Sequence, residues 1–173
     1  MKLSEKVVLI TGGGSGVGAA IARVCGREGA RVVVIGRDEV KLKAVCDSIG
    51  PAATCFAADV TDRPRVKEVV DGVIADRGRI DILVNNAGVN VVDRALAKLT
   101  PENWDFQMDI NVTGSFNLIH AVLPHMRQRR EGTIISISSL AGTQPSVLAG
   151  TAYSASKHGM SVLTKMVDLE ESV

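Results

Sequence analysis

The sequence predicts an α/β fold built on a doubly wound parallel sheet, and three observations lead to that prediction. Short runs of apolar, often β-branched residues alternate with longer segments whose apolar residues recur at helical spacing. A glycine-rich segment joins the first apolar run to the first helical segment. Each strand-and-helix unit is about 30 residues long, the size of a right-handed βαβ crossover. Such units place helices on both faces of one sheet.

The first half of the chain contains three of these units. The expected strands span residues 6–11, 31–35 and 54–58. The expected helices span residues 15–28, 38–49 and 62–77. Asp38 is expected to cap the second of these helices. In the first helix, the apolar residues that share one face, and so are expected to turn toward the core, are Val17, Ile21, Val24 and Cys25.

The second half continues the alternation with longer connections. We expect strands at 81–84 and 133–138, and helices at 101–129 and 151–171. Pro101 suits the first position of a helix, and Pro124 is expected to bend that helix near its end. No linker or low-complexity tract interrupts the pattern, so residues 1–173 are predicted to form a single domain.

Composition excludes several classes of function. The net charge of the 173 residues is +1 with both signs interspersed, which gives no basic footprint for nucleic acid and no polybasic arm for lipid. No apolar run approaches the ~20 residues of a membrane-spanning helix. The amino terminus lacks a signal core, and three cysteines without metal spacing indicate inert thiols. We therefore expect a cytoplasmic protein that binds no nucleic acid, membrane or metal.

The segment after the first strand predicts a dinucleotide site. Its sequence is Thr11-Gly12-Gly13-Gly14-Ser15-Gly16-Val17-Gly18. Glycines allow a tight turn with positive φ and a close approach of the backbone to a ligand. The free N–H groups at the start of the following helix suit a pyrophosphate. The position of the segment between a buried strand and an amphipathic helix supplies most of the specificity.

The spacing Thr-Gly-x-x-x-Gly-x-Gly resembles that of the short-chain dehydrogenase/reductase family. Further matching motifs follow in order: Asp59-Val60, Asn85-Asn86-Ala87-Gly88, Asn111, Ser139 and Tyr153-Ser154-Ala155-Ser156-Lys157. The resemblance implies a Rossmann fold with strand order 3-2-1-4-5. It also implies an oxidoreductase acting on a small carbonyl or alcohol substrate, and a homo-oligomer.

The resemblance also implies which residues hold an NAD(P) cofactor. Asp59 would accept a hydrogen bond from the adenine amino group, although a strand-end aspartate is common in any turn. Without the family, Asn-Asn-Ala-Gly would be a turn signal only. The implied cofactor-binding residues are Gly12, Ser15, Gly16, Val17, Gly18, Asp59, Val60, Asn86, Ala87, Gly88, Tyr153 and Lys157.

The end of the second strand favours NADP(H) over NAD(H). NAD enzymes typically place an acid there for the adenosine ribose, whereas this chain has Gly36 and then Arg37. A guanidinium can bind the 2′-phosphate through two hydrogen bonds. Arg37 could otherwise be a solvated turn residue. Asp38 lies one position too late for the ribose and is better explained as a helix cap.

Tyr153 and Lys157 are four residues apart and therefore share one face of a helix. A free phenol has a pKa of about 10. An ammonium about 4 Å away favours the phenolate by about 4 kcal/mol at an effective dielectric of about 20. A lysine at this spacing can therefore lower the pKa of the tyrosine toward neutral pH, where the phenol can act as a general acid and base.

The remaining catalytic roles come from the resemblance. Tyr153 would exchange the proton of the substrate oxygen, and Lys157 would also hold the nicotinamide ribose. Ser139 would position the substrate oxygen, with Ser138 as its competitor for that role. Asn111 would hold a water that links Lys157 to solvent.

These features predict an NADP(H)-dependent carbonyl reductase or alcohol dehydrogenase. The alternative is a module or fragment that binds nucleotide without catalysis. Family members continue with a sixth and a seventh strand that are missing here, so the strand at 133–138 is expected to be a sheet edge. We therefore expect the chain to be the cofactor half of a longer reductase, or to be completed by another polypeptide.

Overall fold

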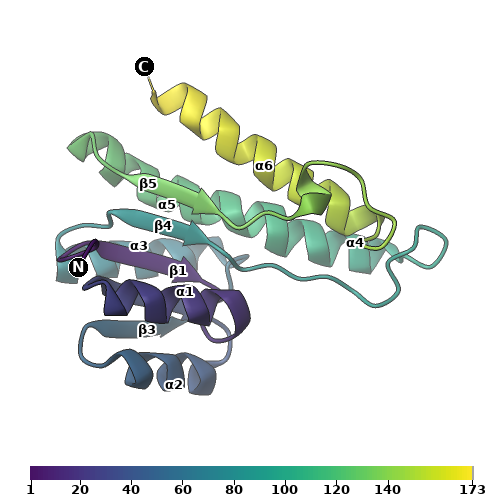
Figure 1. The fold of residues 1–173 in the computed structure, drawn as a ribbon. Helices are drawn as coiled ribbons and strands as arrows, with labels where there is room; N and C mark the ends of the chain where they lie inside the picture. The colour runs from purple at the N-terminus through teal and green to yellow at the C-terminus, as the bar shows by residue number, and fades with distance from the viewer. Residues whose placement is uncertain (173) are drawn as a thin grey trace.

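A computed structural model describes residues 1–172 and shows one parallel sheet between two layers of helices (Figure 1). The strands are β1 (Val7–Thr11), β2 (Arg31–Gly36), β3 (Ala53–Ala57), β4 (Ile82–Asn85) and β5 (Thr133–Ser136). Their spatial order is β3-β2-β1-β4-β5, and every neighbouring pair is parallel. The predicted fold class and strand order are confirmed. Val173, the last residue of the predicted domain, lies outside the described residues.

The helices follow the strands in the predicted alternation. They are α1 (Gly16–Arg27), α2 (Glu39–Ile49), α3 (Arg63–Arg77), α4 (Pro101–Met108), α5 (Gly114–Arg129) and α6 (Thr151–Glu171). A π-helical turn, η1 (Asp109–Thr113), joins α4 to α5, and a short 3-10 turn, η2 (Leu140–Gly142), follows β5. None of the helices within residues 1–172 is both long and apolar enough to cross a membrane.

Strand β1 is apolar over its first four residues, Val7 to Ile10, because both of its faces are buried. Val7 and Leu9 pack into the core formed with α3 and α5, whereas Val8 and Ile10 pack into the core formed with α1 and α2. All four side chains are fully buried. Successive side chains of a strand point to opposite faces, so a strand covered on both sides must be apolar throughout.

The buried face of α1 differs from the predicted one. Val17 and Val24 are 58% and 49% exposed, while Gly18, Ala19 and Ala22 are buried. A Cβ at Gly18 would overlap the Gly12 carbonyl, so the start of the helix lies too close to the loop for a larger side chain. Apolar periodicity alone predicts a buried face for these valines, but it does not report how closely two backbones approach.

The helix predicted at 101–129 is interrupted rather than continuous. In η1 the N–H of Gly114 bonds to the carbonyl of Asp109, five residues earlier, which is the π-helical pattern. Pro124 lies inside α5, and the helix continues to Arg129. The predicted helix therefore consists of two α-helices whose faces are offset by one inserted residue.

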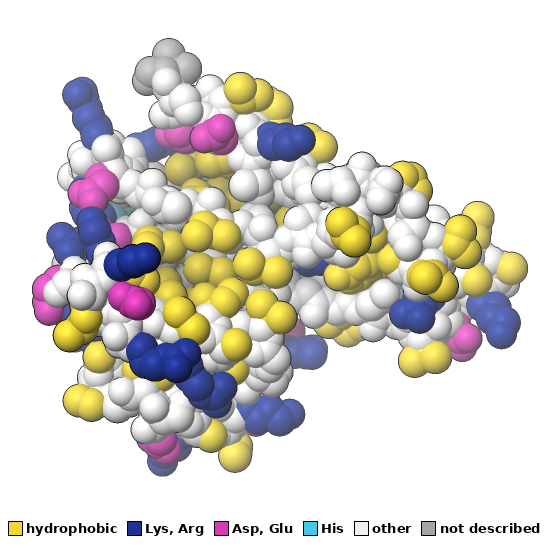
Figure 2. Space-filling view, in the orientation of Figure 1, with side chains coloured by type: hydrophobic (Ala, Val, Ile, Leu, Met, Phe, Trp, Pro, Cys, Tyr) yellow, Lys and Arg dark blue, Asp and Glu magenta, His cyan; other side chains and the backbone are white. Residues whose placement is uncertain are grey.

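Strand β5 forms one edge of the sheet, as predicted, but ends at Ser136 instead of residue 138. Its Ile135 is 44% exposed. Figure 2 shows apolar side chains gathered in the middle of the face drawn, between the regions that Figure 1 labels α1 and α6. On this face the helices α1 and α2 pack against β1, β2 and β3, and the β5 end of the sheet is open.

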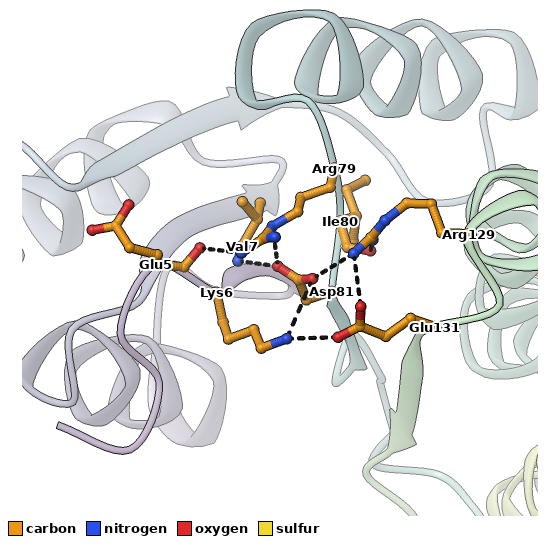
Figure 3. A network of polar contacts seen from close by, with 8 residues as sticks. All are labelled: Glu5, Lys6, Val7, Arg79, Ile80, Asp81, Arg129 and Glu131. Atoms are coloured by element: carbon orange, nitrogen blue, oxygen red, sulfur yellow. Dashed lines mark hydrogen bonds and ion pairs between the residues drawn. The ribbon is translucent and has the colours of Figure 1, made fainter.

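A buried carboxylate joins the amino-terminal ends of the strands β1 and β4 (Figure 3). Asp81 is 3% exposed and accepts hydrogen bonds from the Val7 N–H at 2.8 Å and from Arg129 at 3.0 Å. Arg79 lies 3.0 Å from the same carboxylate, and Lys6 lies 3.8 Å away. Burial raises the pKa of Asp81, but these donors and cations outweigh burial and hold that pKa below its ordinary value.

Candidate functional site

The carboxyl ends of the strands border a cleft of about 1240 Å³. Parallel strands end at the same edge of a sheet, so loops far apart in the sequence meet there. Among residues 1–172, three predicted site residues do not line the cleft: Gly18, Asn111 and Ser139. The predicted residues that line the cleft are Gly12, Ser15, Gly16, Val17, Arg37, Asp59, Val60, Asn86, Ala87, Gly88, Tyr153 and Lys157.

Glycines of the glycine-rich loop leave part of one wall of the cleft without side chains. Gly12 and Gly16 have φ of +65° and +51°, a conformation that other residues rarely adopt. A Cβ on Gly12 would lie 2.9 Å from the side-chain nitrogen of Asn86, whereas one on Gly16 would meet nothing within 4 Å. Ser15 immediately precedes α1, whose N-terminus therefore lies at this wall. The free N–H groups of a helix N-terminus favour an anion.

Thr11 begins the glycine-rich segment but is not among the predicted cofactor-binding residues, and its side chain fixes the loop after β4. Its hydroxyl oxygen accepts hydrogen bonds from the backbone N–H groups of Asn86 at 3.0 Å and Ala87 at 2.9 Å. The Asn86 side chain donates to the Thr11 carbonyl at 2.9 Å. Thr11 is 1% exposed. A polar residue at the end of an otherwise apolar strand was the signal that could have identified it.

Charged side chains gather at the end of the cleft near β2. Arg37 lies 4.0 Å from the Asp59 carboxylate, and both side chains are well exposed. Asp59 also accepts hydrogen bonds from the backbone and the hydroxyl of Thr61, at 2.9 and 2.8 Å. Asp38 accepts from the N–H of Lys41 and caps α2, which confirms the sequence prediction. Lys41 lines the cleft as well and was not predicted.

The turn after β3 is held by a side chain from α5. The amide of Asn117 donates to the Val60 carbonyl at 2.9 Å, and its oxygen accepts from Arg63 at 2.9 Å. Gly114 lies at the same contact, where a Cβ would come within 2.5 Å of a Val60 methyl group. The α5 backbone therefore approaches this turn closely. Nothing in the local sequence marked Asn117 as a partner of a residue 57 positions away.

Tyr153 and Lys157 share one face of α6 and both line the cleft. The Lys157 Nζ lies 5.8 Å from the centroid of the tyrosine ring and donates to the Ile137 carbonyl at 2.9 Å. Lys157 is 3% exposed, and burial lowers its pKa. A Cβ on Gly88 would lie 3.2 Å from this nitrogen, so a larger residue there would crowd the lysine.

Asn111 lies behind the cleft wall in the π-helical turn and is fully buried. Its side-chain oxygen accepts from the Val89 N–H at 2.7 Å. Its side-chain nitrogen donates to the Val89 carbonyl at 3.0 Å and to the Ser156 hydroxyl at 2.9 Å. The asparagine thus ties the loop after β4 to α6, one residue before Lys157.

The two serines after β5 point to different partners. Ser138 lines the cleft, and its hydroxyl lies 2.8 Å from that of Ser161 on α6. Ser139 precedes η2, and its oxygen accepts from the Ala141 N–H at 3.2 Å. Accepting one bond leaves the Ser139 hydroxyl proton available for donation.

Comparison with known proteins gives relatives over nearly the whole chain. An uncharacterized oxidoreductase of Staphylococcus epidermidis is 32% identical, over 98% of this chain and 73% of that protein. The 3-oxoacyl-(acyl-carrier-protein) reductase of Thermotoga maritima is 38% identical, over 95% of this chain and 68% of that protein. A metagenomic short-chain oxidoreductase solved in complex with NADP is 40% identical with a TM-score of 0.92, over 98% of this chain and 78% of that one.

The sequence pattern that defines one family also matches directly. The match covers residues 6–172, which include every strand and helix described above. The motifs quoted from the sequence all fall within that match, and most of them border the cleft. The chain belongs to the short chain dehydrogenase family of oxidoreductases.

Proposed function

We propose that this chain transfers a hydride between NADP(H) and a carbonyl or secondary alcohol, with Tyr153 as general acid and base. The observation that carries the proposal is the placement of Tyr153 and Lys157 on one helix face at the cleft that the glycine-rich loop also lines. A nucleotide site and a proton-transfer pair in one cleft suit a reaction that moves a hydride and a proton together.

The residues of the cleft fit a dinucleotide. Side chains are excluded where Gly12 approaches Asn86, and the N-terminus of α1 lies beside that position. Arg37 would bind the 2′-phosphate, and Asp59 with Val60 would contact the adenine. The related metagenomic enzyme was solved with NADP, which supports the same choice here. A bound nicotinamide would supply the hydride for reduction or accept it in oxidation.

Tyr153 would protonate the carbonyl oxygen as the carbon receives the hydride, and would remove the hydroxyl proton in the reverse direction. Lys157 would favour the tyrosinate by its charge and would hold the nicotinamide ribose. Burial makes the ammonium of Lys157 easier to deprotonate, which suits a group that passes protons.

Ser139 would donate its hydroxyl proton to the substrate oxygen, because the serine accepts rather than donates in its bond to Ala141. Asn111 would hold the relay water through its backbone carbonyl, since its side chain is bound to Val89 and Ser156. That carbonyl accepts a bond from the Ser115 hydroxyl at 2.9 Å, and a carbonyl oxygen has two lone pairs.

The test of catalysis is Tyr153→Phe. We expect turnover of NADPH with a panel of ketones and oxoacyl thioesters to disappear, while the affinity for NADPH measured by fluorescence changes less than about twofold. If the wild-type chain binds NADPH but reduces no member of the panel, the alternative of a non-catalytic nucleotide-binding module is correct. Full activity in the variant would move the proton transfer to another residue.

The test of cofactor choice is Arg37→Asp. The substitution places a carboxylate where the guanidinium would meet the phosphate, so NADPH affinity should fall far more than NADH affinity. Equal loss of affinity for the two nucleotides would refute the 2′-phosphate assignment.

We also propose that the chain associates with copies of itself. Helices α4, α5 and α6 carry exposed apolar residues, including Phe106, Phe116 and Val162, which are 40%, 39% and 59% exposed. Apolar surface of this kind marks association surfaces. Light scattering after size exclusion should give a mass above that of a single chain, and a monomer at micromolar concentration would contradict the proposal.

A further inference from the structure

Four charged side chains lie at the end of the cleft where the adenosine half of a dinucleotide would bind. Arg37 and Lys41 are cations, and Asp38 and Asp59 are anions; all four line the cleft. The two carboxylates would repel a 2′-phosphate and so oppose the NADP(H) preference proposed above. The preference therefore depends on how these negative charges are compensated.

Asp38 is the carboxylate next in sequence to Arg37, and its charge is permanent near neutral pH. Hydrogen bonds from the Lys41 side chain and backbone hold the pKa of Asp38 below its ordinary value. As the N-cap of α2, Asp38 cannot turn away from the cleft without losing its bond to the Lys41 N–H at 3.1 Å. A neutral partner would leave this carboxylate facing the phosphate.

Lys41 is placed to cancel that charge. Its Nζ lies 2.9 Å from the second oxygen of Asp38. Its stem passes the glycine-rich loop, where a Cβ on Gly14 would lie 3.3 Å from the Lys41 Cβ. The Lys41 side chain is 64% exposed, and its ammonium thus pairs with the helix cap at the cleft, where its Cβ lies beside the glycine-rich loop.

The first turn of α2 does not favour a cation at position 41. Lys41 is the third residue of α2, where a capping box would place glutamate or glutamine. A cation in the first turn also opposes the helix dipole. Arg37, by contrast, makes only a 4.0 Å contact with Asp59, which leaves its guanidinium able to turn to a ligand.

We propose that Lys41 is a specificity-determining residue that favours NADP(H) by neutralising Asp38, while Arg37 binds the phosphate. The inference rests on the proposed function, because it assumes that the adenosine half of NADP(H) occupies this end of the cleft. Lys41 acts through Asp38, so removal of the Asp38 charge must relieve the need for the lysine.

The experiment compares dissociation constants for NADPH and NADH, measured by nicotinamide fluorescence, in Lys41→Met, Asp38→Asn and the double variant. Asparagine keeps the helix cap while removing its charge. Lys41→Met should weaken NADPH binding about tenfold, equivalent to about 1.4 kcal/mol, and leave NADH within about twofold. The double variant should bind NADPH within about twofold of wild type. Lys43→Met removes the same charge from an exposed residue of α2 that does not line the cleft, and is the matched control.

The outcomes separate this inference from the function on which it rests. A double variant as weak as Lys41→Met would overturn the inference, because the lysine would then contact the phosphate itself. If Lys41→Met leaves the ratio of the dissociation constants for NADPH and NADH unchanged but lowers the melting temperature, the ion pair only stabilises α2 and the inference is wrong. Wild-type protein that binds neither nucleotide, or prefers NADH, would instead refute the proposed function. Loss of the Lys41→Met effect in 1 M salt would support the electrostatic origin.

Discussion

Asp81 is the buried charge whose removal we expect to cost most stability. Replacing it by asparagine keeps the size of the side chain but removes the charge that three cations and a backbone N–H share. The buried bond from the Val7 N–H to a carboxylate contributes about 1.5 kcal/mol. Arg79 and Arg129 are 37% and 20% exposed, so each pair contributes only about 0.5–1 kcal/mol.

We therefore expect Asp81→Asn to lower the free energy of unfolding by about 3 kcal/mol, the lower end of the range for breaking a buried ion pair. In a chain of this size that corresponds to a fall in melting temperature of about 9 °C. Urea unfolding followed by circular dichroism at pH 7 measures the change. Glu131→Gln is the control: Glu131 belongs to the same network but is 56% exposed, and its removal should cost much less than that of Asp81.

The pH dependence provides a second, independent check. The pKa of Asp81 is lower in the folded protein than its ordinary value. Its contribution to stability is therefore complete above the unfolded pKa of about 4 and is lost as the pH falls through the folded value. The difference between wild type and Asp81→Asn should stay constant from pH 6 to 8 and shrink below about pH 4. A loss under 1 kcal/mol at pH 7, or a difference that grows in acid, would refute the reasoning.

Three further predictions concern the cleft. Thr11→Val should cost about 1–3 kcal/mol in urea unfolding, because two N–H groups of the loop after β4 lose their acceptor, whereas Thr11→Ser should cost less. Gly18→Ala should weaken NADPH binding at least tenfold by pushing the glycine-rich loop aside, while Gly72→Ala, in open space on α3, should be neutral or stabilising; equal binding by both variants would contradict this. Ser139→Ala should lower kcat about 10²-fold. Ser138→Ala should instead act on stability, since its hydroxyl bonds to α6, and the reverse pattern would exchange their roles.

The sheet could be predicted because a strand that is buried on both faces has a continuous run of apolar residues. The first four residues of β1 had to be apolar, and the alternation of strands with helices indicated the class of fold. The buried face of α1 could not be predicted in the same way. Its contact is made by Gly18 and two alanines, and small residues give no periodic apolar signal even where they bring two backbones closest.

In the candidate site as well, contacts within one element could be predicted and contacts between distant elements could not. Tyr153 and Lys157 could be paired from their spacing, because four residues make one turn of a helix. Partners from distant elements could not be predicted: Asn117 reaches Val60 only because the start of α5 packs against the turn between β3 and α3, and nothing near Val60 encodes that approach. Lys41 was missed because a lysine on an exposed helix is ordinary until the cleft is known to run beside it.

The π-helical turn at Asp109–Thr113 makes this stretch sensitive to chain length in a way that surface loops are not. One inserted residue rotates everything that follows by about 100° around the helix axis. Deleting a residue here would restore an ordinary helix, yet it would rotate α4, with its buried Gln107, relative to the buried residues of α5. In comparisons of related chains, a gap at this point should therefore be rarer than a substitution, because the spacing itself carries information.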